Sequence, residues 1–443
     1  MSQGGQEGEA ALSPRQSLFV GVTLFSMFFG AGNLILPPLL GVQAGRETLP
    51  ALLGFLVAGV GLPVLGIVAV ALSGTLRELA ARVHPRFARV FVALVYLAIG
   101  PCLAIPRTAS TAFEMLAPLL PQDWSLEAAR LAFSLVFFSL AFALAMRPGR
   151  LTRLLGRVTG PALILLIVAV VAASLAGLAS AASAPSAPAV APYDANAAVQ
   201  GFLTGYQTMD LLASLTFGLV IATNVRSLGV TEQGGVMREV CRAGAIAGVL
   251  MVAVYGGLAV VGFEQCEALA GATNGAAVIT AAATQHFGTA GTIVVAAIFL
   301  LACLNVCIGL ISCCGSYFAD ELPRVTYRGC AVAIAAFSCA VANLGLDAIL
   351  DLSATLLGAL YPIAIVLVTL GMLRRRADRA PRVWAWTVVV AAVVSAAEVV
   401  CDALALPALP LPLADVGLGW VCPVLVAALL AFMVPNNARK ELT

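Results

Sequence analysis

Long apolar runs separated by short polar segments make up most of this chain. The hydrocarbon core of a bilayer is about 30 Å thick, so a helix that crosses it needs about 20 apolar residues. Measured against this length, the pattern predicts an all-α integral membrane protein with about twelve transmembrane helices. The spans are predicted at 17–43, 49–73, 88–117, 128–146, 155–179, 202–225, 240–262, 290–317, 326–345, 348–373, 383–405 and 417–435.

Composition strengthens this interpretation. Of the 443 residues, 61% are hydrophobic and only 10% are charged, against about 25% charged in an ordinary soluble protein. A soluble core cannot hide so much apolar surface. This excludes a soluble enzyme, a nucleic-acid-binding protein and a disordered scaffold. The loops show no P-loop and no nucleophile–base set, so we expect no enzymatic activity, no cofactor and no ATP-driven transport.

The basic residues gather in alternate loops. With the N-terminus inside, 21 of the 24 Lys and Arg residues fall in inside segments, Arg46 and Arg130 fall outside, and Arg107 lies within a span. Positive residues are enriched on the cytoplasmic side of a membrane, so we expect both termini in the cytoplasm. The stretch 1–16 has no basic n-region, and we expect no cleavable signal peptide.

Two spans contain features that interrupt a helix. In span one, Gly30-Ala31-Gly32-Asn33 is followed by Pro37 and Pro38, which predicts a break at 29–33 and a second half-helix that starts near Asn33. Span six has a predicted break at Ser214–Gly218. Five spans separate the two breaks, and an odd number inverts the second unit relative to the first. Paired interrupted helices in this relation indicate the midplane site of a transporter, whereas small residues can also serve close helix packing.

The unpaired backbone at a break has its own chemistry. The N-terminus of a half-helix offers free N–H groups and a positive dipole end, which suit a carboxylate. Unwound carbonyls suit a desolvated cation such as Na⁺.

Several stretches resemble the branched-chain amino acid:cation symporter family. They include FFGAGNLILPPLLGVQAG (28–45), YLAIGPCLAIPRTA (96–109), GYQTMD (205–210) and FGLVIATNVRSLGVTE (217–232), in the family's order and spread over nearly the whole chain. The family is similar to the leucine-transporter-type class, in which spans one to five and six to ten form an inverted repeat and spans eleven and twelve are peripheral. This resemblance implies import of Leu, Ile and Val with Na⁺ by alternating access, in the inner membrane of a bacterium.

The resemblance also implies site residues. The substrate would lie beside Gly30, Ala31, Gly32, Thr216, Phe217 and Gly218. The cation would lie among Ser26, Phe29, Asn33, Ile308 and Ser312. Ile311 departs from the class pattern, because it offers no side-chain oxygen where the class has a hydroxyl. That departure motivates an alternative in which H⁺ is the coupling ion, with Asp210 or Glu114 as its carrier.

Ionisable residues inside a membrane are costly and are candidates for function. We expect Arg107 and Glu114 to belong to a structural or gating ion network rather than to contact the substrate. We expect Asp210, one turn before the predicted second break, to lie near a cation path or to fix the broken helix. A non-transporting amino acid receptor is a further alternative, in which the arginine cluster 374–382 would dock a partner.

The predicted spans divide the chain into five parts. These are a cytoplasmic tail (1–16), a first five-helix repeat (17–179), an external linker (180–201), a second repeat (202–373) and peripheral helices with a cytoplasmic tail (374–443). The linker contains SAASAPSAPAVAP, a composition typical of a flexible connection. The outside stretch 264–289 is a candidate for a short helix that lies across the outer face.

Overall fold

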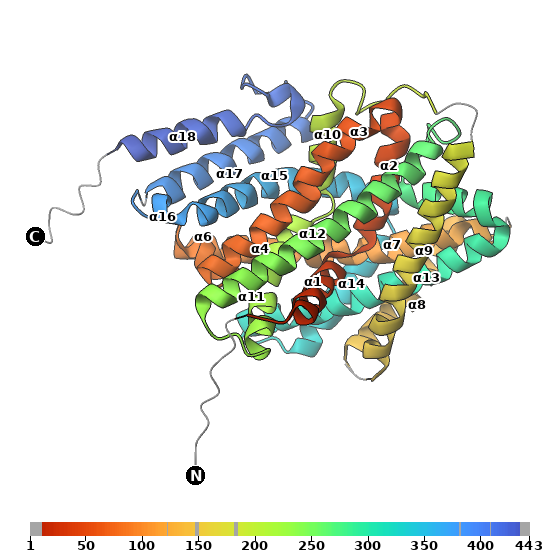
Figure 1. Ribbon diagram of the computed structural model, residues 1–443, viewed down its shortest axis with the longest axis horizontal. Helices are drawn as coiled ribbons and strands as arrows, with labels where there is room; N and C mark the ends of the chain where they lie inside the picture. Colours follow the sequence, from red (N-terminus) through yellow and green to blue (C-terminus); the bar gives the residue numbers. More distant parts are fainter. Residues whose placement is uncertain are drawn as a thin grey trace, which may run out of the picture.

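The computed structural model describes residues 11–121, 123–146, 150–180, 185–380, 382–407 and 409–434, with only the backbone for 150–160. Helices pack side by side throughout the described part of the chain (Figure 1). Each of the twelve predicted spans coincides with one helix or with consecutive helices joined at a short break. By length and apolar character, eight described helical segments could cross a membrane, or nine if α10 and α11 form one bent span; α14 and α18 are apolar but shorter.

Span one is two helices, as predicted. α1 (Pro14–Phe28) ends at Phe29, and α2 (Ala31–Ala44) starts directly after Gly30. Phe29 and Gly30 both have extended backbone conformations. The break therefore lies inside the predicted 29–33 segment, and the second half-helix starts two residues earlier than Asn33.

Span six is also broken, but not where the sequence predicted. α10 (Ala197–Tyr206) and α11 (Asp210–Ser227) meet at a 48° bend. The predicted break at Ser214–Gly218 is wrong, because those residues lie within α11. Asp210 accordingly is the first residue of the second half-helix and does not precede the break. Met209 turns the chain with φ 63°, a left-handed conformation that bulky residues rarely adopt.

The remaining helices complete the bundle, and the short helix predicted in the stretch 264–289 is the first part of α13. The Gly288 backbone, with φ 62°, separates residues 275–287 from the rest of α13. The remaining helices are α3 (Thr48–Leu56), α4 (Leu62–Ser73), α5 (Leu76–Ala81), α6 (Pro85–Leu97), α7 (Ala104–Leu116), α8 (Leu126–Ala145), α9 (Arg150–Ser180), α12 (Gln233–Glu264), α13 (Gly275–Glu321), α14 (Tyr327–Ala342), α15 (Leu346–Met372), α16 (Arg374–Ala377), α17 (Arg382–Ala403) and α18 (Val421–Met433).

Glycines bring neighbouring helices into backbone contact. A Cβ at Gly262 of α12 would overlap the Pro38 carbonyl of α2, and a Cβ at Gly201 of α10 would overlap the Ala51 carbonyl of α3. Span seven thus packs on span one, and span six packs on span two. In a five-plus-five inverted repeat, span one corresponds to span six and span two corresponds to span seven. The contact of span seven with span one therefore corresponds to the contact of span two with span six. Small residues allow such close approach in membranes.

Arginine ion pairs join different helices at one end of the bundle. At this end, here called the arginine-rich end, Arg77 pairs with Glu321 at 2.7 Å and Arg82 with Asp378 at 2.6 Å. The opposite end holds the segment predicted as a flexible linker. Its described part is packed rather than detached, because the Arg46 N–H donates to the Ala187 carbonyl at 3.0 Å.

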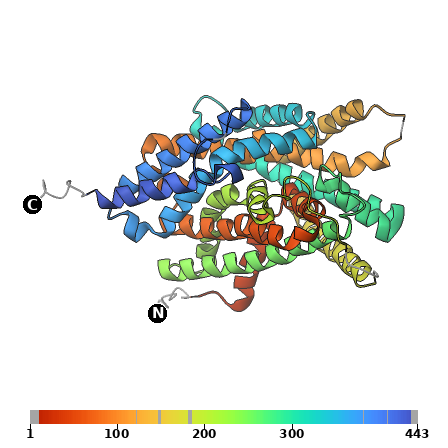
Figure 2. The same cartoon turned by 90° about the horizontal axis from the view of Figure 1, so that it is seen from above.

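The last two spans lie at one edge of the molecule. α17 packs on α15 and α18 on α17, and both views place these blue helices to one side (Figures 1 and 2). Their peripheral position matches the expectation that spans eleven and twelve lie outside the repeats. The functional site is therefore sought among spans one to ten.

Candidate functional site

A buried polar cluster lies where the two breaks meet. Asn33 Nδ2 and the Tyr255 hydroxyl each donate to Asp210 Oδ2, both at 2.7 Å. Asn33 and Tyr255 are also hydrogen-bonded to each other. The exposed fractions are 2% for Asn33, 2% for Asp210 and 0% for Tyr255. The cluster joins the half-helices α2 and α11 to α12.

Thr208 and Asp210 organise the second break. The Thr208 hydroxyl donates to the Gly205 carbonyl at 2.9 Å and accepts from the Asp210 N–H at 3.2 Å. One side chain thus satisfies a carbonyl of α10 and an N–H of α11. Asp210 also places a carboxylate at the positive end of α11, which stabilises both the helix and the buried charge.

Arg107 reaches the same region from α7. Its helix begins after a π-helical segment, Ala98–Cys102, that contains a kink at Gly100. The Arg107 guanidinium is buried, and Nη1 donates to the Gln207 carbonyl at 2.6 Å. It also lies against Gly32, where a Cβ would overlap Nη2 and Cζ. Arg107 therefore touches both broken spans.

The predicted substrate residues of span one lie at the start of α2. Ala31 and Gly32 are buried, and Gly30 is half-buried. The Gly30 N–H already donates to Asn33 Oδ1 at 3.3 Å. Asn33 thus links the helix start to the polar cluster, since its two amide atoms face Gly30 and Asp210.

The predicted substrate residues of span six lie farther along α11 than expected. The Thr216 hydroxyl donates to the Ala213 carbonyl within its own helix. Phe217 packs edge-to-face on Phe28 of α1, with ring centroids 5.5 Å apart. Gly218 serves close packing, because a Cβ there would lie 2.9 Å from Val70 Cβ. The three residues follow the break by two turns instead of forming it.

Among the described residues, no side-chain hydrogen bond joins the predicted cation residues of span one to those of span eight. Ser26 is exposed and donates to the Thr23 carbonyl. Ser312 donates to the Ile308 carbonyl at 2.9 Å. Ile311 is fully buried in an apolar cluster that also contains Ile308. Its side chain thus fills a core position where the class carries a hydroxyl.

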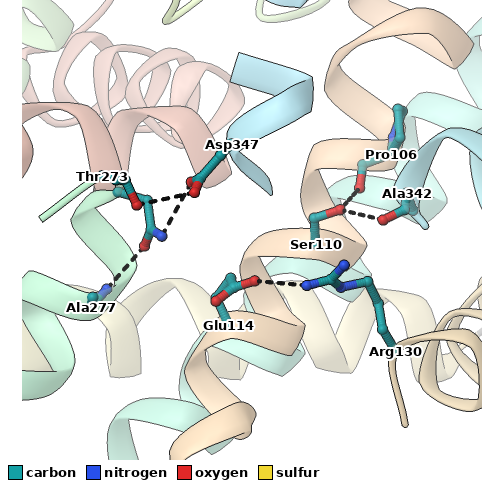
Figure 3. Close-up of polar contacts among 9 residues, drawn as sticks. Pro106, Ser110, Glu114, Arg130, Thr273, Ala277, Ala342 and Asp347 are labelled. Carbon is teal, nitrogen blue, oxygen red and sulfur yellow. Dashed lines mark hydrogen bonds and ion pairs between the residues drawn. The ribbon is translucent and has the colours of Figure 1, made fainter. Parts of the chain in front are cut away.

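Glu114 lies apart from this cluster. It faces Arg130 of α8 at 3.8 Å (Figure 3). The pair lies where α7 ends and α8 begins, opposite the arginine-rich end. In the same region Asp347, at the start of α15, accepts from Thr273 and Asn274, which precede α13 (Figure 3). Arg107 and Glu114 therefore belong to different networks.

Three members of the site were not predicted from the sequence. They are Tyr255, Thr208 and the backbone of Gln207. Thr208 and Gln207 lie in the GYQTMD stretch, which was noted only for its resemblance. No pattern in span seven distinguishes Tyr255 from an ordinary buried tyrosine.

Comparison with known proteins places the chain in a family. A profile described as "Branched-chain amino acid transport protein" matches residues 13–438. The chain belongs to this family. The branched-chain amino acid transport system 3 carrier protein of Pseudomonas aeruginosa is 39% identical, over 93% of this chain and 94% of the relative. The branched-chain amino acid permease BrnQ of Escherichia coli K12 is 35% identical over 98% of each chain.

A further relative belongs to the same class of protein. BraB of Bacillus subtilis, named a branched-chain amino acid permease, is 34% identical over 98% of this chain and 99% of the relative. These relatives are named permeases or carriers, and this branched-chain amino acid transporter family member is not an enzyme.

Solved structures confirm the five-plus-five inverted repeat. Mhp1, a nucleobase-cation-symport-1 family transporter, matches in a closed conformation with a TM-score of 0.59, over 94% of this chain and 91% of that one. Its inward-facing conformation matches with a TM-score of 0.60, over 96% and 93%. Sequence identity is 16% and 15%, so this likeness concerns the fold alone.

Proposed function

We propose that this family member is a secondary active symporter that imports Leu, Ile and Val by alternating access. The observation that carries the proposal is the meeting of two broken spans at one buried charged cluster. Helix ends, a carboxylate and a guanidinium converge there among otherwise apolar helices. Burying such polar and charged groups in a membrane costs free energy, and groups of this kind mark solute or ion pathways.

Two cavities support a path on either side of this cluster. One of about 320 Å³ includes Thr216 and lies at the arginine-rich end, beside Arg77 and Glu321. Another of about 840 Å³ includes Gln207, at the break itself, and Glu398. Alternating access requires that a central site connect with each side in turn. The substrate would bind between them, beside residues 30–32 and Thr216, Phe217 and Gly218.

We propose Na⁺ as the coupling ion, with Asn33, the carbonyls of Ser26, Phe29 and Ile308, and the Ser312 hydroxyl as its oxygen ligands. H⁺ is the second candidate, because Ile311 removes one oxygen from that set. The proton would then reside on Asp210, the carboxylate held between the half-helices. Glu114 is the less suitable carrier, since it faces Arg130 away from the breaks.

A binding measurement separates these ions. Leucine binding to purified protein would be measured by scintillation proximity in NaCl and in choline chloride at one pH. We expect tight binding only in NaCl. Equal binding in both salts would move the assignment to H⁺ and Asp210. A folded protein that binds leucine in neither salt would contradict the proposed substrate.

We further propose that the protein lies in a bacterial inner membrane with both termini in the cytoplasm. The support is the gathering of arginines at one end of the bundle. Labelling of single cysteines with an impermeant maleimide, in a variant without native cysteines, tests this topology. Cysteines replacing Ser227 or Leu322 should be protected in intact cells, whereas one replacing Asp194 should react. The reverse pattern would invert the proposed orientation.

A further inference from the structure

Arg107 carries a charge that its surroundings only partly compensate. Its exposed fraction is 3%, and its Nε has no hydrogen-bond partner. Asp210 is the nearby carboxylate, but no ion pair within 4.0 Å joins the two among the described residues. Asp210 Oδ2 instead accepts from Asn33 and Tyr255. Burying a guanidinium without a close anion is unfavourable.

The two helix ends beside Arg107 act on it in opposite ways. Its bond to the Gln207 carbonyl places a cation at the negative C-terminal end of α10, which is favourable. Its position against Gly32 places the same cation at the positive N-terminal end of α2, which is unfavourable. An anion that accepted hydrogen bonds from both the guanidinium and the start of α2 would compensate both positive groups.

We propose that Arg107 binds the α-carboxylate of the transported amino acid, together with the N-terminus of α2. This inference rests on the proposed function, because it takes a free amino acid as the substrate. A guanidinium suits the task, since its planar fork presents two parallel N–H donors to a carboxylate. It replaces the expectation that Arg107 serves only a structural or gating network.

The surrounding groups then position the rest of the bound amino acid. The substrate ammonium faces Asp210 and the carbonyls at the end of α1, because these groups carry negative charge. Gly32 gains a specific role, since only a residue without a Cβ leaves room for the guanidinium. The site therefore selects a free carboxylate and rejects amino acid amides.

A ligand-and-side-chain cycle tests this role. Dissociation constants for leucine and for leucinamide would be measured on wild-type protein, on R107Q and on R107K, at a pH where both amines are protonated. We expect the wild type to prefer leucine by about 10- to 100-fold, the range that hydrogen bonds to charged groups supply. In R107Q this preference should fall to nearly one, and R107K should retain an intermediate preference.

Arg130→Gln is the matched control. Arg130 is a guanidinium on α8 that faces Glu114, away from the breaks. The R130Q variant should keep the wild-type preference. Elution as a single species and thermal melting identify variants that fold.

The outcomes separate binding from structure. If Arg107 only caps α10, R107Q would weaken leucine and leucinamide equally and leave their ratio unchanged, and that result overturns the inference. If R107Q does not fold, R107K decides, because an unchanged ratio there also overturns it. If folded wild type binds no leucine at all, the proposed function fails first. A wild type that binds both ligands equally refutes the Arg107 role while leaving transport intact.

Discussion

At the residue scale, Asp210 is the group on which the account depends most. It begins α11, accepts from Asn33 and Tyr255, and lies close to Arg107. The substitution Asp210→Asn keeps the shape of the side chain and one oxygen that accepts hydrogen bonds, but it removes the charge. Charge and packing can therefore be separated at this position.

We predict that D210N lowers ion-driven leucine uptake at least tenfold while the protein still folds. The physical reason is that a neutral amide neither attracts Na⁺ nor carries a proton. Uptake of radiolabelled leucine into proteoliposomes measures this loss of transport. Asp123→Asn, at an exposed position in the loop before α8, is the matched control and should transport normally. Normal uptake by D210N would remove Asp210 from the mechanism.

Tyr255 should contribute less than Asp210. Y255F removes one donor to the carboxylate and leaves the Asn33 bond, a loss of about 1–3 kcal/mol where the partner is charged. We predict a reduced affinity for the coupling ion, seen as a higher ion concentration at half-maximal leucine binding. An unchanged ion dependence would mean that the hydroxyl serves packing alone.

Gly32 offers a steric test of the same site. We predict that G32A abolishes leucine binding, because the added methyl overlaps the Arg107 guanidinium. Gly256 of α12 is the matched control, since a Cβ there meets nothing within 4 Å. If G32A binds leucine as well as G256A does, leucine binding does not depend on the observed position of Arg107 against Gly32.

At the element scale, close backbone packing sets how the half-helices are held. Gly262 supports α2 from α12, and Gly201 supports α10 on α3. Each contact meets a backbone carbonyl, which cannot move aside as a flexible side chain can. The two contacts are equivalent under the inverted repeat.

We predict that G262V and G201V both destabilise the protein, by at least the 1–3 kcal/mol typical of overpacking. Thermal melting in detergent would show lower midpoints for both variants, and G256V serves as the control. A fall for one variant only would indicate that the two contacts do not act as equivalents.

The breaks show how far sequence patterns reach at this scale. Span one was predicted correctly because glycines cluster at its break and prolines follow it. Span six was misplaced because its break uses Met209 in a left-handed conformation, and the Thr208 side chain supports it. Gly218, which suggested the wrong position, serves helix packing instead. Hydropathy located the helices, whereas the cluster around Asp210 depends on tertiary contacts with Asn33 and Tyr255 that no local pattern encodes.

At the scale of the whole molecule, the inverted repeat explains why one site can serve two sides. Spans one and six break near the same buried cluster, and their partner spans seven and two hold them by similar contacts. A cavity lies toward each end of the bundle. Rocking of one part against the other would open these paths in turn.

Ion-driven accumulation of leucine tests this account most directly. Purified protein in proteoliposomes would receive radiolabelled leucine outside, with an inward Na⁺ gradient, equal pH on both sides and the membrane potential clamped at zero. Na⁺-coupled symport predicts transient accumulation above the external concentration, which disappears when Na⁺ is equal on both sides. Leucine that merely equilibrates, at a rate indifferent to the Na⁺ gradient, would contradict Na⁺-coupled symport.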